Sequence, residues 1–195
     1  MHLQRRGFPV TAIDAAPEGV ECARRRGVRD DRLMDGRRLD FPQHRFDTLV
    51  MFGNNFGICG GPVATRRFLV RAHGIARRKG RLLASTRTPG SWKKPHAAYV
   101  KSNVREGRAA GLIRLRVVYG GRTGDWFRLL FVSPDDLLRL CEATGWDVLR
   151  ILPGREGIDQ VRLRHPEDVE RPFSERAELG AWDWRHADSP PMLSR

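Results

Sequence analysis

The fold of this chain is decided by the stretch GFPVTAIDAAPE, residues 7–18. Its first half is rich in β-forming residues and ends in a lone carboxylate, Asp14. Its second half starts a helix, because Pro17 suits the first helical position and Glu18 interacts favourably with the helix dipole. In nucleotide-binding α/β folds, an acidic residue at the end of the second strand binds the ribose hydroxyls. The stretch therefore predicts a strand, a helix and a ribose-binding carboxylate.

The residues that follow predict further strands. The helix from Pro17 spans about ten residues and stops at Gly27, which suits a left-handed backbone position. Leu33 and Met34 form a short strand, closed by a turn at Asp35-Gly36. Residues 46–52, FDTLVMF, are nearly continuously apolar, as in a strand that is covered on both faces. We expect this strand to be central in its sheet.

The middle of the chain repeats the same order of elements. A flexible loop, residues 53–61, leads into a helix that opens at Pro62. The basic residues 77–79 favour the negative end of the helix dipole, and Gly80 is expected to end the helix. Residues 81–86 then form another buried strand. This order predicts an α/β, Rossmann-like, mostly parallel sheet with helices on both faces. Its ligands are expected at the carboxyl ends of the strands, which carry Asp14, Asp35, Asn54 and Thr86.

The last part of the chain predicts antiparallel strands. Residues 88–108 are polar, which slightly favours a solvated connection over a lid. Two β-rich stretches, residues 112–119 and 126–132, are typical of an antiparallel pair. Ser133 begins the best-marked helix, with Pro134 at its first position and acidic Asp136 at its third.

A final pair of strands is expected over residues 146–152 and 158–164. From His165 onward, prolines and mixed charges dominate the sequence. We expect one domain over residues 1–164 and a loosely docked or disordered tail over residues 165–195.

Composition limits the class of protein. No apolar run approaches the roughly 20 residues that a membrane span needs, and no signal-peptide pattern follows Met1, so we expect a cytoplasmic protein that contacts no membrane. The three cysteines are widely scattered, which supports neither a disulfide framework nor a metal site. The net charge of +13 is carried almost entirely by arginine. A coding bias toward arginine explains this better than a nucleic-acid-binding face, which stays the alternative.

Three stretches resemble the class I S-adenosylmethionine-dependent methyltransferases. Residues 7–18 resemble the second strand of that family and the start of the next helix. Residues 35–42, DGRRLDFP, and the strand at 46–50 are similar to the segment in which an Asp bonds the adenine amino group. Residues 75–83 resemble a helix end and the fifth strand, with Lys79 in place of a usual glycine or proline. The resemblance covers residues 3–164 and implies S-adenosylmethionine as cofactor.

The resemblance implies a set of cofactor contacts. Asp14 would accept hydrogen bonds from the ribose, and its alternative is an ordinary exposed turn carboxylate. Asp35 would bond the adenine, although Asp-Gly is equally good turn chemistry. Residues 52–54 would border the methyl-donor centre, although Phe52 suits the core equally well and Asn54-Asn55 suit a simple loop. The predicted contacts are Asp14, Ala15, Asp35, Gly36, Phe52, Gly53 and Asn54.

One part of the family pattern is missing from the sequence. The first strand and its glycine-rich loop would precede Leu3, and that strand normally lies at the centre of the sheet, between strands two and four. Its absence would leave two strand edges unpaired, which favours self-association, a rearrangement or a chain whose true start lies before Met1. It would also weaken cofactor binding, so we expect no submicromolar affinity by calorimetry.

Three functions follow from these observations. The first is a methyltransferase-like protein acting on a small molecule, and the second is a non-catalytic remnant or interaction subunit of the same fold. The third is a basic nucleic-acid-binding module. The catalytic residue stays unassigned, because His73, His96, Tyr99 and Tyr119 lack a partner pattern that would set them apart. The sequence specifies neither the substrate and methylated atom nor the oligomeric state. The residues of the third alternative are Trp92, Lys93, Lys94, His96, Tyr99 and Lys101.

Overall fold

A computed structural model describes residues 1–89, 94–152 and 158–165, with the side chains of residues 94–96 and 158–159 left out. The chain forms two compact units, Met1–Phe41 and a second that begins at Pro42. The predicted domain of residues 1–164 and its boundary with the tail stay predictions. The predicted tail, apart from His165, lies outside the described residues.

Unit 1, Met1–Phe41, is a small α/β unit. Its elements in chain order are α1 (His2–Arg5), β1 (Thr11–Asp14), α2 (Pro17–Arg25), β2 (Asp30–Leu33) and the 3-10 turn η1 (Gly36–Arg38). β1 and β2 pair in parallel, with Asp14 opposite Leu33. α2 begins at Pro17 and is followed by Gly27 at φ +86°, which confirms the predicted start and stop of this helix.

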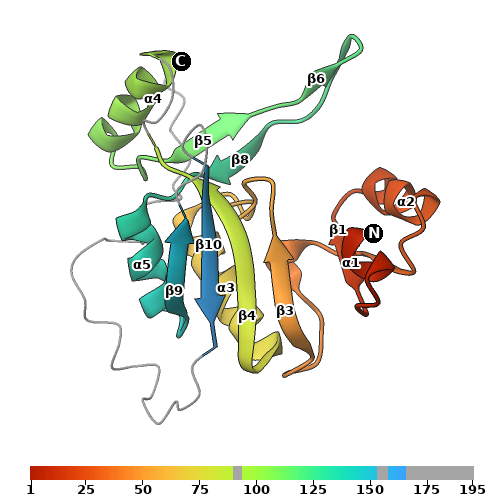
Figure 1. Ribbon diagram of the computed structural model, residues 1–195. Helices are drawn as coiled ribbons and strands as arrows, with labels where there is room; N and C mark the ends of the chain where they lie inside the picture. Colours follow the sequence, from red (N-terminus) through yellow and green to blue (C-terminus); the bar gives the residue numbers. More distant parts are fainter. Residues whose placement is uncertain (90–93, 153–157, 166–195) are drawn as a thin grey trace. The chain divides into compact units, whose positions relative to one another are not determined.

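Unit 2 is built on a four-stranded sheet in the order β3-β4-β10-β9 (Figure 1). Its strands are β3 (Phe46–Met51), β4 (Ala76–Arg87), β9 (Asp147–Leu152) and β10 (Ile158–Arg164). β3 and β4 are parallel, whereas β10 runs antiparallel to both β4 and β9. This arrangement confirms the predicted antiparallel pair at the end of the chain. The mixed α/β architecture also agrees with the predicted fold class.

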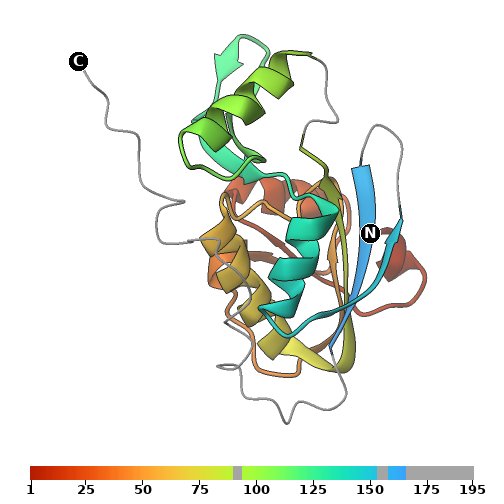
Figure 2. The ribbon, with the colours of Figure 1, turned by 90° about the vertical axis from the view of Figure 1, so that its left-hand side faces the viewer.

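Two helices, α3 (Pro62–Ile75) and α5 (Pro134–Glu142), cover the same face of this sheet (Figure 2). Trp146 lies in the core between them and donates a hydrogen bond from Nε1 to the carbonyl oxygen of Leu69, at 3.0 Å. α5 begins as predicted, because Ser133 Oγ accepts a hydrogen bond from the backbone nitrogen of Asp136. The largest fully buried side chains of this core include Leu69, Ile75, Leu82, Leu137, Leu140 and Leu163.

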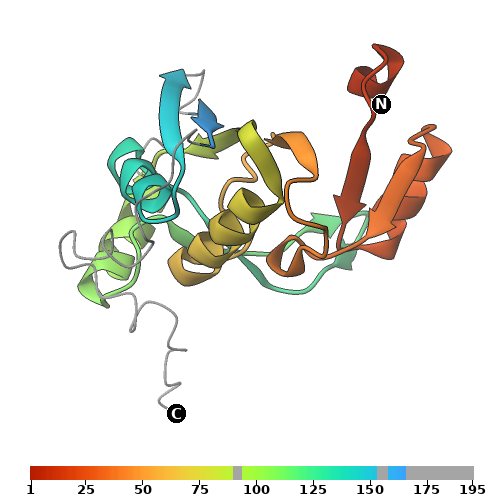
Figure 3. The same cartoon turned by 90° about the horizontal axis from the view of Figure 1, so that it is seen from below.

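A ribbon and one more helix complete unit 2. Helix α4 (Lys94–Arg105) occupies most of the region where a solvated connection was expected. The predicted antiparallel pair is present as β5 (Leu112–Leu115) with β8 (Phe127–Leu130), continued by β6 (Val118–Tyr119) with β7 (Arg122–Thr123). In the view from below, the ribbon lies on one side of α3 and β9 lies on a different side (Figure 3). None of the described helices is long and apolar enough to cross a membrane.

Two sequence predictions about unit 2 were wrong. β3 was expected at the centre of the sheet with both faces covered, yet it pairs only with β4 in this unit, and Val50 is 42% exposed. The helix before β4 was expected to end at Gly80, but α3 ends at Ile75 and residues 77–79 already belong to β4. Pairing explains the early end: Ala76 lies opposite Phe46, and Arg77 binds the carboxylate of Asp47 at 3.0 Å.

The three cysteines differ in burial. Cys22 is exposed, whereas Cys59 and Cys141 are buried, and none of the three forms a disulfide with a described residue. Burial raises the pKa of Cys141 to about 12, from an ordinary value of 9.0. The folded chain holds this proton while the unfolded chain loses it, so stability is expected to fall as the pH rises from 9.0 toward about 12.

We therefore expect a thiol reagent at mildly alkaline pH to modify only Cys22 in the folded protein, and to modify Cys59 and Cys141 only after unfolding. Timed alkylation followed by mass spectrometry measures this. As the control, Cys22→Ser should leave the alkaline loss of stability unchanged. Rapid native modification of Cys141 would contradict the buried position of this thiol.

Candidate functional site

Asp14 stands at the carboxyl end of β1, as the sequence predicts. Its Oδ1 accepts a hydrogen bond from the backbone nitrogen of Ala16 at 2.8 Å, which fixes the carboxylate at the start of α2. Among the described residues no donor reaches Oδ2. The residue is exposed, so this oxygen is available to a ligand hydroxyl.

Gly19 provides the space in which the Asp14 carboxylate lies. A Cβ at residue 19 would stand 2.4 Å from Oδ2 and 2.9 Å from Oδ1 of Asp14. No side chain fits there without moving the carboxylate. Sequence reasoning missed Gly19, because a glycine inside a helix gives no local sign of what packs above it.

Asp35 is engaged by a neighbouring arginine. It caps η1 through the backbone nitrogen of Arg37 at 2.9 Å, and Nη2 of the same arginine lies 2.7 Å from Oδ2. The hydrogen bond from the Arg37 side chain lowers the pKa of the Asp35 carboxyl group. The turn role of Asp35-Gly36 is therefore present in the structure, and the adenine contact stays a prediction.

In unit 2, the loop after β3 carries the other predicted residues. Phe52 is 53% exposed, and Gly53 and Asn54 adopt left-handed backbone angles of +78° and +66°. Ser85 Oγ accepts a hydrogen bond from the Asn54 backbone nitrogen at 2.8 Å, which ties the loop to β4. Asn54 Oδ1 is buried and accepts no hydrogen bond from the described residues. The carboxyl end of β3 is thus followed by a buried acceptor that the described residues leave unsatisfied.

The side chains considered for catalysis show no arrangement that would mark one of them as catalytic, among those that the structure describes. The His73 ring stacks on His165 at 3.8 Å, beside Trp146. The Tyr99 hydroxyl accepts a hydrogen bond from the backbone nitrogen of Arg114 at 3.3 Å, and Tyr119 is 85% exposed on the ribbon. The side chain of His96 lies outside the described residues.

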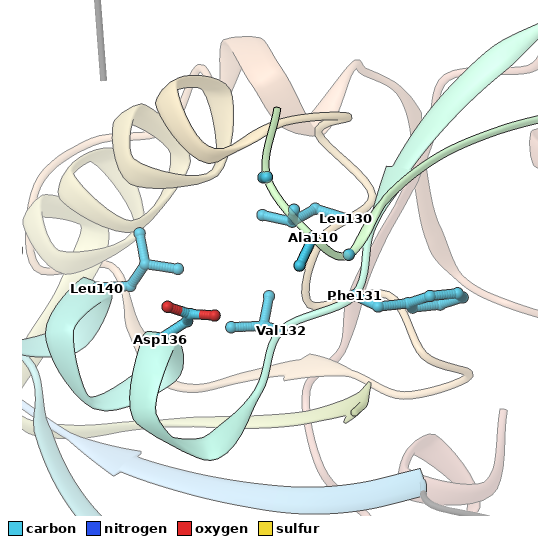
Figure 4. A pocket seen from close by; sticks show the side chains of 8 residues that line it. Ala110, Leu130, Phe131, Val132, Asp136 and Leu140 are labelled. Atoms are coloured by element: carbon cyan, nitrogen blue, oxygen red, sulfur yellow. The ribbon is translucent and has the colours of Figure 1, made fainter. Parts of the chain in front are cut away.

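A small pocket beside α5 is part of the core (Figure 4). With about 10 Å³ of free volume it has room for about one water molecule. Its one carboxylate, Asp136, already accepts a hydrogen bond from Ser133 Oγ at 2.7 Å. Among the described residues no group of histidine, cysteine and acidic side chains could hold a metal ion.

Comparison with known proteins identifies the fold. Residues 1–84 match a family described as "Methyltransferase domain". The chain superimposes on a SAM-dependent methyltransferase from Bacteroides fragilis, solved in complex with S-adenosyl-L-homocysteine. The TM-score is 0.68 and the identity 25%, over 84% of this chain and 66% of that one. The chain therefore has the fold of the class I S-adenosylmethionine-dependent methyltransferases. This confirms the resemblance drawn from residues 7–18, 35–50 and 75–83.

Two further structures share the methyltransferase fold. A SAM-dependent methyltransferase from Methanosarcina mazei has a TM-score of 0.69 and 16% identity, over 86% of each chain. The 1,6-didemethyltoxoflavin-N1-methyltransferase of Burkholderia thailandensis has a TM-score of 0.53 and 19% identity, over 85% of this chain and 64% of that one. A search of the curated proteins gave no match. The chain thus spans about two thirds of the length of the Bacteroides fragilis and Burkholderia thailandensis methyltransferases.

Proposed function

We propose that this chain binds S-adenosylmethionine and transfers its methyl group to a small molecule. The observation that carries the proposal is the Asp14 carboxylate, held by the Ala16 backbone over Gly19 within the part of the chain that matches a methyltransferase domain. The free Oδ2 of Asp14 suits a ribose hydroxyl, because a carboxylate accepts several hydrogen bonds. The small-molecule class is supported by the Burkholderia thailandensis enzyme, which was solved with 1,6-didemethyltoxoflavin.

The residues of this chain would bind and orient the two reactants. When bound, S-adenosylmethionine supplies an electrophilic methyl group, which a substrate nucleophile takes while the carbon–sulfur bond breaks. Asp14 would hold the ribose, and residues 52–54 stay the predicted border of the methyl-donor centre. Positioning provides most of the catalysis in such a transfer, so no general base is assigned.

Calorimetric titration with S-adenosylhomocysteine tests the proposal. We expect binding with a Kd above about 1 µM. Absence of binding at millimolar concentration would favour the alternative, a non-catalytic remnant of the same fold. A submicromolar Kd would contradict the weakened binding expected from the sequence, which stays a prediction.

Gly19→Ala tests the space beneath Asp14. An added methyl group would push the carboxylate away, so we expect the Kd for S-adenosylhomocysteine to rise roughly tenfold, or about 1.4 kcal/mol. The fold should persist, since alanine favours a helix over glycine by about 1 kcal/mol. The control is Gly74→Ala in α3, where a Cβ would meet nothing within 4 Å. Equal affinities for the two variants would show that the position of Asp14 does not matter.

Self-association is supported by unpaired strand edges. β1 in unit 1 and β3 in unit 2 each pair with a strand along one edge only, among the described residues. Such edges are templates for pairing with another chain. Sedimentation velocity over a range of concentrations tests this, and a monomer at every concentration would contradict it.

A further inference from the structure

The ribbon β5–β8 carries an arginine-rich face with one aromatic ring at its centre. Arg114 and Arg128 lie directly opposite each other across the strands. The guanidinium carbons of Arg114 and Arg116 each lie 4.8 Å from the centre of the Trp126 ring. The ring contacts bring Arg114, Arg116 and Trp126 together. Arg128 lies on the same face as Arg114, because residues directly opposite each other in an antiparallel pair point to the same side of the sheet.

This arginine face is charged and open. Residues 112–130 contain four arginines and a single carboxylate, Asp125. Among the described residues, none of the four arginines forms an ion pair, and Trp126 is 51% exposed. Unpaired guanidinium groups fit phosphate oxygens well, since they donate two parallel hydrogen bonds. The face therefore suits an anionic partner.

The shape of the ribbon favours a polymer over a small molecule. A small ligand needs a concave site that buries most of its surface, whereas residues 116–128 of the ribbon are all exposed. The ribbon is also preformed: Gly120 and Gly121, at φ +55° and +74°, make the tight turn between β6 and β7. Arg114 and Arg116 are two residues apart, which is about 7 Å in extended backbone, so a chain of regularly spaced charges could contact both.

The aromatic side chains identify which polyanion fits. Tyr119 is 85% exposed near the tip, and Trp126 lies among the arginines. Bases of single-stranded nucleic acid stack on such rings while arginine binds their phosphates. A membrane fits less well, because Arg122 stands at the tip, where an inserted hairpin would bury it.

We propose that the arginine face of this ribbon binds single-stranded nucleic acid. The surface comprises Arg114, Arg116, Arg128 and Trp126, with Tyr119 toward the tip. It differs from the nucleic-acid module considered from the sequence, of which only Tyr99 and Lys101 have described side chains. The proposal does not depend on methyl transfer, because it uses none of the predicted cofactor contacts.

The test uses fluorescence anisotropy of the full chain with labelled oligothymidylate. We expect binding that weakens steeply with salt. The variant R114Q/R116Q/R128Q should bind roughly tenfold or more weakly, and its log–log salt slope should fall by about 2, as three lost phosphate contacts predict. Trp126→Ala should weaken binding and Trp126→Phe should restore most of it.

The matched control is R6Q/R26Q/R29Q, which removes the same charge from exposed arginines outside the ribbon. An equal loss of affinity in the two triple variants would overturn the proposal, as would absence of binding. Binding to anionic lipid vesicles but not to oligothymidylate would also overturn it. Should a variant fail to fold, photocrosslinking of the wild-type chain to bromodeoxyuridine oligonucleotides decides, and crosslinks outside residues 112–130 would count against the ribbon.

Discussion

Replacing Gly57 with alanine is expected to lower the free energy of unfolding by roughly 3 kcal/mol, at the upper end of the cost of overpacking. A Cβ at this residue would stand 1.9 Å from the carbonyl oxygen of Leu130, a backbone atom that cannot rotate away. The two backbones touch because Gly57 O also accepts the hydrogen bond of the Leu130 nitrogen at 3.0 Å. The loop after β3 is thereby fixed against β8.

Urea denaturation of Gly57→Ala measures this cost. The control is Gly124→Ala in the ribbon that contains β8, where the new Cβ would be 3.6 Å from its nearest heavy atom, the carbonyl oxygen of Val117. That change should alter stability by less than about 0.5 kcal/mol. Equal stability of the two variants would show that the loop carrying Asn54 does not pack on β8.

Replacing Asp14 with alanine is expected to weaken binding of S-adenosylhomocysteine at least about 100-fold. Two charge-assisted hydrogen bonds from the ribose would be lost, each contributing about 1.5 to 3 kcal/mol. Loss of the contact to the Ala16 nitrogen should cost only about 1 kcal/mol of stability, comparable to loss of a helix cap. Calorimetry and thermal unfolding of the same sample separate the two effects.

Asp40→Ala serves as the control for charge, because Asp40 is another exposed carboxylate of unit 1. Its affinity for S-adenosylhomocysteine should match that of the wild-type chain. If Asp14→Ala binds as tightly as Asp40→Ala, the carboxylate is an ordinary turn residue, the alternative considered from the sequence.

Local chemistry made much of the fold predictable. Pro17 and Gly27 mark the two ends of α2, and Ser133 with Asp136 marks the start of α5. Each signal works through contacts within a few residues, so no knowledge of tertiary packing is needed. The resemblance to class I methyltransferases likewise rests on short stretches of sequence, residues 7–18, 35–50 and 75–83.

The predictions that were wrong concern long-range pairing. The sequence placed the end of α3 at Gly80, because the basic residues 77–79 suit a helix end. In the structure Ala76 pairs with Phe46, so residues 77–79 belong to β4 instead. The position of β3 in its sheet likewise depends on which strands pair with it, whereas its apolar sequence reports only a tendency to be buried.

The candidate site shows the same division. Asp14 was predicted as a candidate because it ends a β-rich segment, and the structure places it at the end of β1. Gly19 and Ser85 were missed, since their roles consist of what they contact: the Asp14 carboxylate and the Asn54 nitrogen. The ion pair between Asp35 and Arg37 was also not predicted, because the Asp-Gly pair explains the turn without it.

Hydrogen exchange with and without saturating S-adenosylhomocysteine tests whether Asp14 holds the cofactor, because it locates the bound molecule on the chain. We expect slower exchange in peptides that contain the β1–α2 junction, residues 14–19, and in those that contain the loop after β3. Binding that leaves exchange at residues 14–19 unchanged would contradict this role of Asp14, even if other parts of the chain were protected.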